Sequence, residues 1–294
     1  SASRPLFVSN TAQRDEAVAV QTGMCSWSDS FAGLEALLRW EQIYQRDGRS
    51  AATRWAKDNF LSPGRLWSCW RLKQGIIQDG SRAGLRWVDT SILDKPMELP
   101  GEEESVFEAR ESLGADMDIQ GQLQPSDVEV DAPMSSGLNE EDMELLACIL
   151  CFAYPSNLAV ARKGSLKHET KSVRHARVAN ASVNSLGRRA RMDDLEKQNL
   201  LKGVRWLSYG AMKMSRGEIG FMFPTTLLSE WQIALFGGMS IAGKEPDGFQ
   251  VDDWLKVSST TPGTCRIILS LRQEIAEALE WTSLHARRRS TRSA

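Results

Sequence analysis

The chain has 294 residues, a formal net charge of −2 and an apolar content of 41%. That length suits about two domains with their own hydrophobic cores. No apolar run approaches the roughly 20 residues of a membrane span, and the first residues lack the charged-then-apolar order of a signal peptide, so no membrane partner is expected.

The five cysteines follow no regular spacing, which argues against a disulfide framework and predicts a reducing, intracellular compartment. Nucleus, cytoplasm and mitochondrion all remain open. Cys148 and Cys151 lie on a predicted apolar helix without a second pair of ligands, so we interpret them as core residues and expect no metal site. The three histidines form no Ser/His/Asp pattern, and we predict no catalytic residue.

Residues 1–93 are predicted to form a helical domain. Six of the ten tryptophans lie before position 90, which indicates an aromatic core between packed helices. Cap residues and the helical spacing of apolar residues predict three helices with short connections, as in a small bundle. We expect these helices at 29–47 with Asp29 as the cap, at 51–60, and from Ser62-Pro63 to Asp79-Gly80.

Residues 94–138 differ from the rest of the chain. Four prolines interrupt them, and between Arg86 and Leu145 there are 17 acidic residues against 3 basic ones. Low apolar content with high charge predicts a mostly disordered insert. We interpret it as a solubilising linker. The alternatives are that it binds a protein partner or competes with RNA for a basic surface.

Residues 139–156 are predicted to be the last helix of the helical domain. Asn139 is a good cap, acidic residues occupy the positively polarised first turn, and Pro155 ends the helix. The helix has a wide apolar face, made by Leu145, Leu146, Ile149, Leu150 and Phe152.

The hydrophobic period changes after Asn157. Short, partly alternating runs predict five strands, at 158–162, 165–170, 173–178, 204–212 and 218–223. Five short strands are typical of a small barrel of the oligonucleotide-binding (OB) type, which we assign to 157–245. Residues 246–294 are predicted to be a C-terminal extension, with a helix at about 264–281 and a basic tail. The fold class is therefore α+β, a helical bundle followed by a five-stranded barrel and a C-terminal helix.

The barrel region is basic, with 14 basic and 4 acidic residues between Arg162 and Arg216. Lys and Arg side chains neutralise phosphates and release counterions, so this region is the main candidate for a polyanion-binding surface. A basic surface that is merely solvated is the alternative.

Several sequence blocks occur in the order found in the C-terminal region of DEAH/RHA-type (DExH-box) RNA helicases, which the chain resembles. The blocks cover nearly the whole chain apart from the acidic insert. They are Ser28-Asp-Ser-Phe-Ala-Gly-Leu-Glu-Ala-Leu-Leu-Arg-Trp40, Asn59-Phe-Leu-Ser-Pro63, Leu146 to Tyr154-Pro155, Ala181-Ser-Val-Asn184, Trp206 to Arg216, Phe221 to Gly238, Val251-Asp-Asp-Trp254 and Leu271-Arg272.

The resemblance implies a helicase-associated helical domain, an OB-fold and a terminal helix. It also implies a motor of two RecA-like domains and a winged-helix domain before Ser1. The chain itself has no Gly-x-x-x-x-Gly-Lys-Ser/Thr phosphate loop and no Asp-Glu-x-His motif. We therefore expect no ATP hydrolysis by this chain, no cofactor within it, and ATP with Mg²⁺ only in the parent motor.

The resemblance also implies RNA-binding residues. Lys213, Ser215 and Arg216 fall on the strand and turn that the family directs toward RNA, and Ser182 and Asn184 fall on its Ser-Val-Asn turn. Arg174 and Arg177 are additional phosphate-binding candidates.

Two family positions have changed. The family's Glu-Lys is Ala211-Met212 here, and its frequent Arg-Asp is Phe223-Pro224. Both changes remove polar groups that would touch the RNA backbone.

Two functions follow as hypotheses. In the first, the chain is the accessory region of an ATP-dependent RNA helicase that acts in RNA processing. Its barrel would hold single-stranded RNA beside the motor, and its surface could also receive a glycine-rich activator protein. In the second, the chain is a protein-interaction platform within a ribonucleoprotein, with weak or no RNA binding of its own.

Overall fold

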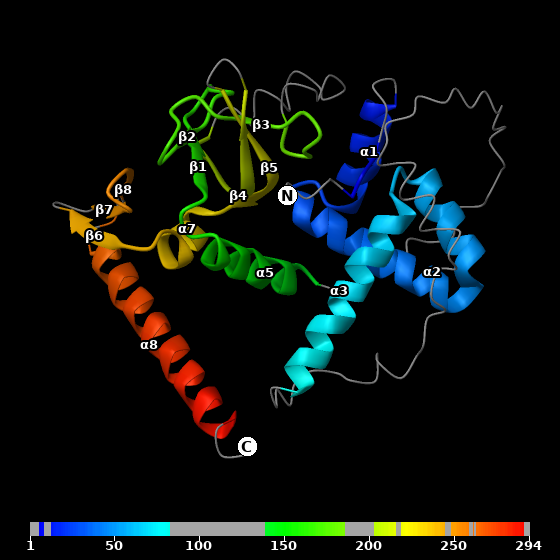
Figure 1. The fold of residues 1–294 in the computed structure, drawn as a ribbon. Helices are drawn as coiled ribbons and strands as arrows, with labels where there is room; N and C mark the ends of the chain where they lie inside the picture. Colours follow the sequence, from blue (N-terminus) through cyan, green and yellow to red (C-terminus); the bar gives the residue numbers. More distant parts are fainter. Residues whose placement is uncertain are drawn as a thin grey trace. The chain divides into compact units, whose positions relative to one another are not determined.

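The computed structural model describes residues 6–8, 13–82, 139–185, 203–215, 219–244, 248–258, 261 and 263–290. Within these ranges the fold is α+β, with six helices, a curled five-stranded sheet and a small three-stranded sheet (Figure 1). The predicted insert at 94–138 and Arg216 lie outside the described residues.

The chain divides into two compact units, which we treat separately. Among the described residues, 6–8 and 37–82 form the helical unit, and 13–36 and 139–290 form the sheet unit. The sequence analysis placed residues 13–36 and the helix at 139–156 in the helical domain, whereas here both group with the sheets.

The helical unit contains most of α2 (Asp29–Asp58) and α3 (Pro63–Arg82). The two helices predicted at 29–47 and 51–60 are continuous in the structure, apart from a kink at Gly48. The φ of Gly48 is +81°, a conformation that side chains with a Cβ rarely adopt. The third predicted helix is confirmed, and it begins with the proline at its first position.

Tryptophans form the centre of the helical unit, as the composition predicts. Trp67 makes edge-to-face contacts with the rings of Trp40, Tyr44 and Trp70, with centroid separations of 5.3, 5.3 and 5.6 Å. The buried Glu41 carboxylate accepts hydrogen bonds from Trp70 Nε1 at 3.2 Å and from Lys73 Nζ at 2.6 Å. Aromatic packing and one ion pair therefore join α2 to α3.

The sheet unit begins with α1 (Arg14–Met24), which the sequence analysis did not anticipate. The helix predicted at 139–156 is confirmed as α5 (Glu140–Ala153). Its Asn139 cap is confirmed as well. The Asn139 side chain accepts from Asp142 N, and the Asp142 side chain accepts from Asn139 N, which together form a capping box.

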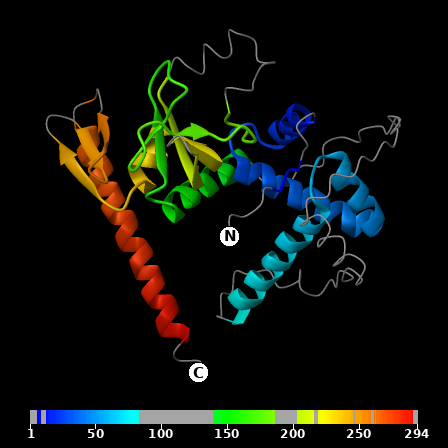
Figure 2. The same cartoon turned by 45° about the horizontal axis from the view of Figure 1, so that its top comes forward.

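This unit contains a curled five-stranded sheet (Figure 2). Its strand order is β2-β1-β4-β5-β3. All of its strand pairs are antiparallel except β3 with β5. The five predicted strands are confirmed, with shifted ends, as β1 (Leu158–Ala161), β2 (Glu169–Thr170), β3 (Arg177–Val178), β4 (Arg205–Met214) and β5 (Gly220–Leu228).

Backbone hydrogen bonds link the two edges of this sheet. His168 N donates to Ala176 O at 2.8 Å, and Ala176 N donates to His168 O at 2.9 Å. The sheet therefore curls until its edge strands β2 and β3 meet. Its core contains Ala159, Ala176, Val178, Leu207, Tyr209 and Met222.

The chain after β5 forms α7 (Glu230–Phe236) and a second sheet of three antiparallel strands. Neither was predicted from the sequence. The strands are β6 (Ile241–Lys244), β7 (Gly248–Val251) and β8 (Leu255–Ser258). The predicted terminal helix is confirmed as α8 (Thr264–Ser290), and its first turns pack on β6 and α7. None of the described helices combines the length and apolar character that a bilayer span requires.

The tryptophan cluster generates a stability prediction. Trp67→Ala removes a buried ring that three neighbouring rings contact, so it should lower the free energy of unfolding by about 3–5 kcal/mol. Leu72→Ala, at an exposed position of the same helix, should change it by less than about 0.5 kcal/mol. Guanidinium denaturation followed by circular dichroism measures both. Equal losses for the two variants would contradict the packing described here.

Candidate functional site

A buried carboxylate lies where α2 meets the five-stranded sheet within the sheet unit. Asp29 is 5% exposed. The prediction that its side chain caps the helix is wrong, because Ser28 performs that role. Phe31 N donates to Ser28 Oγ at 3.2 Å, and Ser28 Oγ is also 2.8 Å from Thr226 Oγ1 of β5.

Both oxygens of Asp29 accept hydrogen bonds from distant parts of the chain. Oδ2 accepts from Ser182 Oγ at 2.6 Å, from Thr225 N at 2.7 Å and from Thr225 Oγ1 at 3.1 Å. Oδ1 accepts from Val183 N at 2.9 Å and from Gln21 Nε2 at 3.1 Å. A carboxylate offers about four acceptor sites, so protein donors occupy this one fully.

The electrostatics of Asp29 follow from this enclosure. Burial raises the pKa of its carboxyl group, and the hydrogen bonds from Ser182, Thr225 and Val183 offset part of that rise. A raised pKa can mark a catalytic acid. Here every lone pair faces a donor of the protein itself, so the group joins α1, α2 and β5 rather than acting on a substrate.

Two predicted RNA-binding residues belong to this network. Ser182 is 1% exposed and Asn184 is 6% exposed. Ser182 Oγ lies 2.8 Å from Thr225 Oγ1 in addition to its bond to Asp29. Asn184 Nδ2 donates to Trp27 O at 3.1 Å and to Thr225 Oγ1 at 3.0 Å. The polar atoms of both side chains face the protein interior, so we do not place them in the candidate interface.

The other predicted residues, apart from Arg216, lie at the surface of the five-stranded sheet. Lys213 and Ser215 are exposed at the end of β4, Arg177 is exposed in β3, and Arg174 is exposed just before it. The register pairs Lys213 with Phe221 on one side of β5, and Arg177 with Phe221 on the other side. The fold thus brings two cations, distant in sequence, to either side of one strand.

The surface around these residues is strongly basic. Within the described residues 158–185 and 203–215, Glu169 is the one acidic residue, and it pairs with Arg162 at 3.5 Å. Seven basic side chains are exposed in the same ranges. They are Arg162, Lys163, Lys167, Lys171, Arg174, Arg177 and Lys213.

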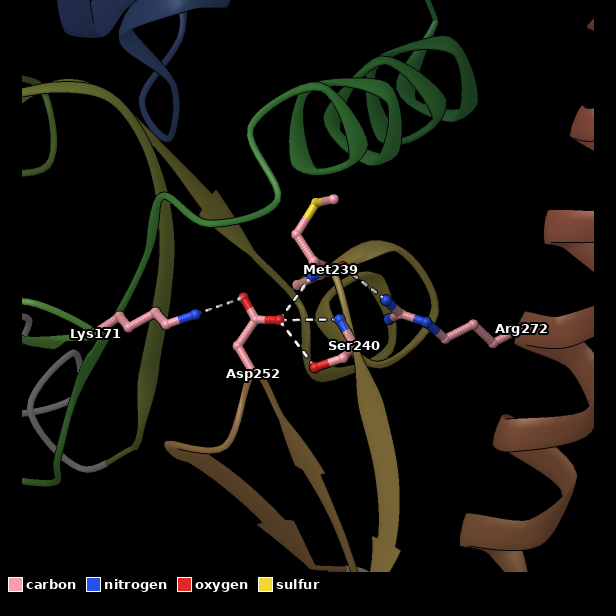
Figure 3. A network of polar contacts seen from close by, with 6 residues as sticks. Lys171, Met239, Ser240, Asp252 and Arg272 are labelled. Atoms are coloured by element: carbon pink, nitrogen blue, oxygen red, sulfur yellow. Dashed lines mark hydrogen bonds and ion pairs between the residues drawn. The ribbon is translucent and has the colours of Figure 1, made fainter.

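A second polar network fixes the connection between α7 and β6 (Figure 3). Asp252 Oδ1 accepts from Met239 N at 2.8 Å and from Ser240 N at 2.9 Å, while Oδ2 lies 3.9 Å from Lys171 Nζ. Arg272 of α8 donates to the backbone oxygen of Gly238 at 2.8 Å. These contacts hold backbone groups in place, and we assign the network a structural role.

Gly238 is required at this position. Its φ is +71°, and a Cβ there would collide with Val251. The Leu235-Phe-Gly-Gly238 block and the Val251-Asp-Asp-Trp254 block therefore meet in three dimensions.

The cysteines show no reactive arrangement. Cys151 is buried, and burial raises the pKa of its thiol to about 12, so it stays protonated. Across the ranges that the structure describes, no three His, Cys, Asp or Glu side chains gather in a way that would hold a metal ion.

Comparison of the sequence with protein-family models found no match, and neither did a search of curated proteins. The resemblance to DEAH/RHA-type helicases therefore rests on the sequence blocks themselves.

The Asp29 network generates a second stability prediction. Asp29→Asn places an NH₂ group opposite N–H and O–H donors, so it should lower the free energy of unfolding by about 3 kcal/mol. Asp253→Asn is the matched control, because Asp253 is exposed and its φ of 63° suits asparagine. Chemical denaturation compares the two. A cost for Asp29→Asn as small as that of the control would exclude a structural role for the carboxylate.

The buried His168 generates a pH prediction. Burial, with a smaller contribution from Arg205, lowers the pKa of its imidazole to about 4, against about 6.5 in an unfolded chain. Between these values the unfolded state binds more protons, so His168 adds stability that is present above pH ~6.5 and lost as pH falls toward 4, at most about 3 kcal/mol.

Replacement of His168 tests that contribution. His168→Met should flatten the dependence of unfolding free energy on pH in this window, whereas His175→Gln, at an exposed histidine, should keep the wild-type slope. Urea denaturation at several pH values measures the slopes. Identical slopes for His168→Met and the wild type would refute the contribution.

Proposed function

We propose that this chain is the RNA-binding accessory region of an ATP-dependent RNA helicase of the DEAH/RHA type. In this proposal the five-stranded sheet is an OB-type barrel that holds single-stranded RNA beside a motor. The helices of the first unit belong to a helicase-associated domain. ATP and Mg²⁺ belong to the motor, and we assign no reaction to the chain itself.

One observation carries the proposal. Exposed cations from β3, β4 and the loops between strands surround a single curled sheet, and Glu169 is the sole acid in the described part of that region. A cluster of cations on a small barrel is the arrangement that binds the backbone of a single strand without reading its sequence. The strand order, and the hydrogen bonds that link β2 to β3, support an OB-type barrel.

The two changed family positions limit which residues of the proposed interface can bind phosphate. Ala211 and Phe223 are cross-strand partners, and so are Met212 and Met222. The side chains at 211, 212 and 223 are all apolar and cannot bind phosphate. In this proposal the neighbouring cations bind it instead, chiefly Lys213 and Arg177.

A second candidate is the protein-interaction platform, and the surface of α5 favours it. Leu145, Ile149 and Phe152 follow one another at helical spacing on its outer face and are 61%, 52% and 56% exposed. A row of large exposed apolar side chains is characteristic of protein-binding surfaces. This candidate requires no RNA binding.

A salt series separates the two candidates. Labelled oligouridine should bind the chain, and Lys213→Ala/Arg177→Ala should weaken binding about tenfold at low salt and reduce the slope of log K against log salt by about 1.4. Lys256→Ala/Arg266→Ala removes the same charge from exposed positions outside the five-stranded sheet and should have little effect. Fluorescence anisotropy gives both quantities.

Two results would count against RNA binding at this sheet. Absence of binding to the wild-type chain at low salt would leave the interaction platform as the better account. Equal losses in the two double variants would show that binding follows net charge rather than the surface of the sheet.

A further inference from the structure

Two phenylalanines lie between the cations of the candidate interface. Phe221 and Phe223 occupy alternate positions of β5, so their side chains leave the strand on the same face. In the register, Phe221 lies opposite Lys213 of β4 on one side and opposite Arg177 of β3 on the other. A cation, an aromatic ring and a second cation therefore form one row across three strands.

The burial pattern shows that this row faces outward. The neighbouring row consists of Val178, Met222 and Met212, which belong to or pack against the core. Because side chains alternate across a sheet, the row of Arg177, Phe221 and Lys213 lies on the opposite face. The exposure of both cations agrees with this assignment.

The inward face of β4 shifts by one residue at Gly210. Leu207 and Tyr209 are buried before it, and Met212 packs against the same core after it. Gly210 lies against the ring of Pro224, where a Cβ would be 2.9 Å from Pro224 Cδ. After this shift, Met212 and Met222 face the core, and Lys213, Phe221 and Phe223 lie on the opposite, outward face of the sheet.

The neighbours of Phe223 on the adjacent strands have small side chains. Phe223 pairs with Ala211, which is exposed, and Phe221 and Phe223 are themselves half-buried. On the β3 side the chain continues into Ala179, whose N–H donates to Met222 O at 3.0 Å. A methyl group is the largest side chain at either of these two neighbouring positions.

We propose that Phe221 and Phe223 form a stacking platform for two unpaired bases of single-stranded RNA, with Lys213 and Arg177 binding the flanking phosphates. The inference rests on the proposed function and names the residues that would contact the bases and the phosphates. Every base has a π face, so such a platform tolerates any sequence.

Charge favours RNA over a protein partner at this surface. Within the described residues, neither Lys213 nor Arg177 has a carboxylate at ion-pair distance, so two cations border the rings. An apolar peptide would have to desolvate these cations, whereas a phosphate backbone would neutralise them.

Two matched strands test the platform. One is labelled oligouridine of about 12 nucleotides, and the other has the same length and charge but carries abasic riboses. Phe221→Leu/Phe223→Leu keeps apolar volume at both half-buried positions and removes the rings. It should weaken oligouridine binding at least about tenfold and leave abasic-strand binding within about twofold. Phe221→Tyr/Phe223→Tyr keeps the rings and should bind oligouridine like the wild type.

The outcomes distinguish this inference from the function on which it rests. If oligouridine binds the wild type and the leucine variant equally, the platform is refuted and RNA binding stands. If the wild type binds both strands equally tightly, bases contribute nothing and the platform is again refuted. If the wild type binds neither strand, the proposed function fails and the platform fails with it. Abasic-strand affinity also reports whether the leucine variant keeps a folded sheet.

Discussion

The sheet unit depends on one buried carboxylate. Asp29 receives donors from α1, from the turn at 182–183 and from β5. Val183 lies 154 positions and Thr225 lies 196 positions from Asp29 in the sequence. Removing a carboxylate from water is costly, and the cost is offset only while all of these donors stay in place. The first turn of α2, the Ser-Val-Asn turn and β5 are therefore coupled, and a shift of any one would leave a buried polar group unpaired.

This coupling explains why some of the predicted RNA-binding residues are buried and others are exposed. Ser182 and Asn184 are polar residues in a turn, which is a pattern typical of ligand contacts, but their partners are Asp29, Trp27 and Thr225. Lys213 and Arg177 lie on β4 and β3, which pair with either side of β5, and their side chains are exposed. The buried residues support the surface, and the exposed ones are available to form it.

Local signals in the sequence predicted much of the fold. Asn139 with its acidic first turn, and Pro63 at a first helical position, marked helix starts, and alternation found all five strands of the larger sheet. Helix α1 was missed because no side chain caps it at Gln13. Helix α7 was missed although Ser229 and Gln232 form a capping box. The burial of Ser182 was not predictable, because its partner lies 153 positions away in sequence.

The link between His168 and Ala176 has a consequence for self-association. An open sheet edge presents unpaired N–H and C=O groups that another chain can extend. Strands β2 and β3 have two residues each, and the pair of hydrogen bonds beside them already uses backbone groups at that edge. Within the described residues, the five-stranded sheet therefore offers almost no template for strand addition, so edge-to-edge association through this sheet is not expected.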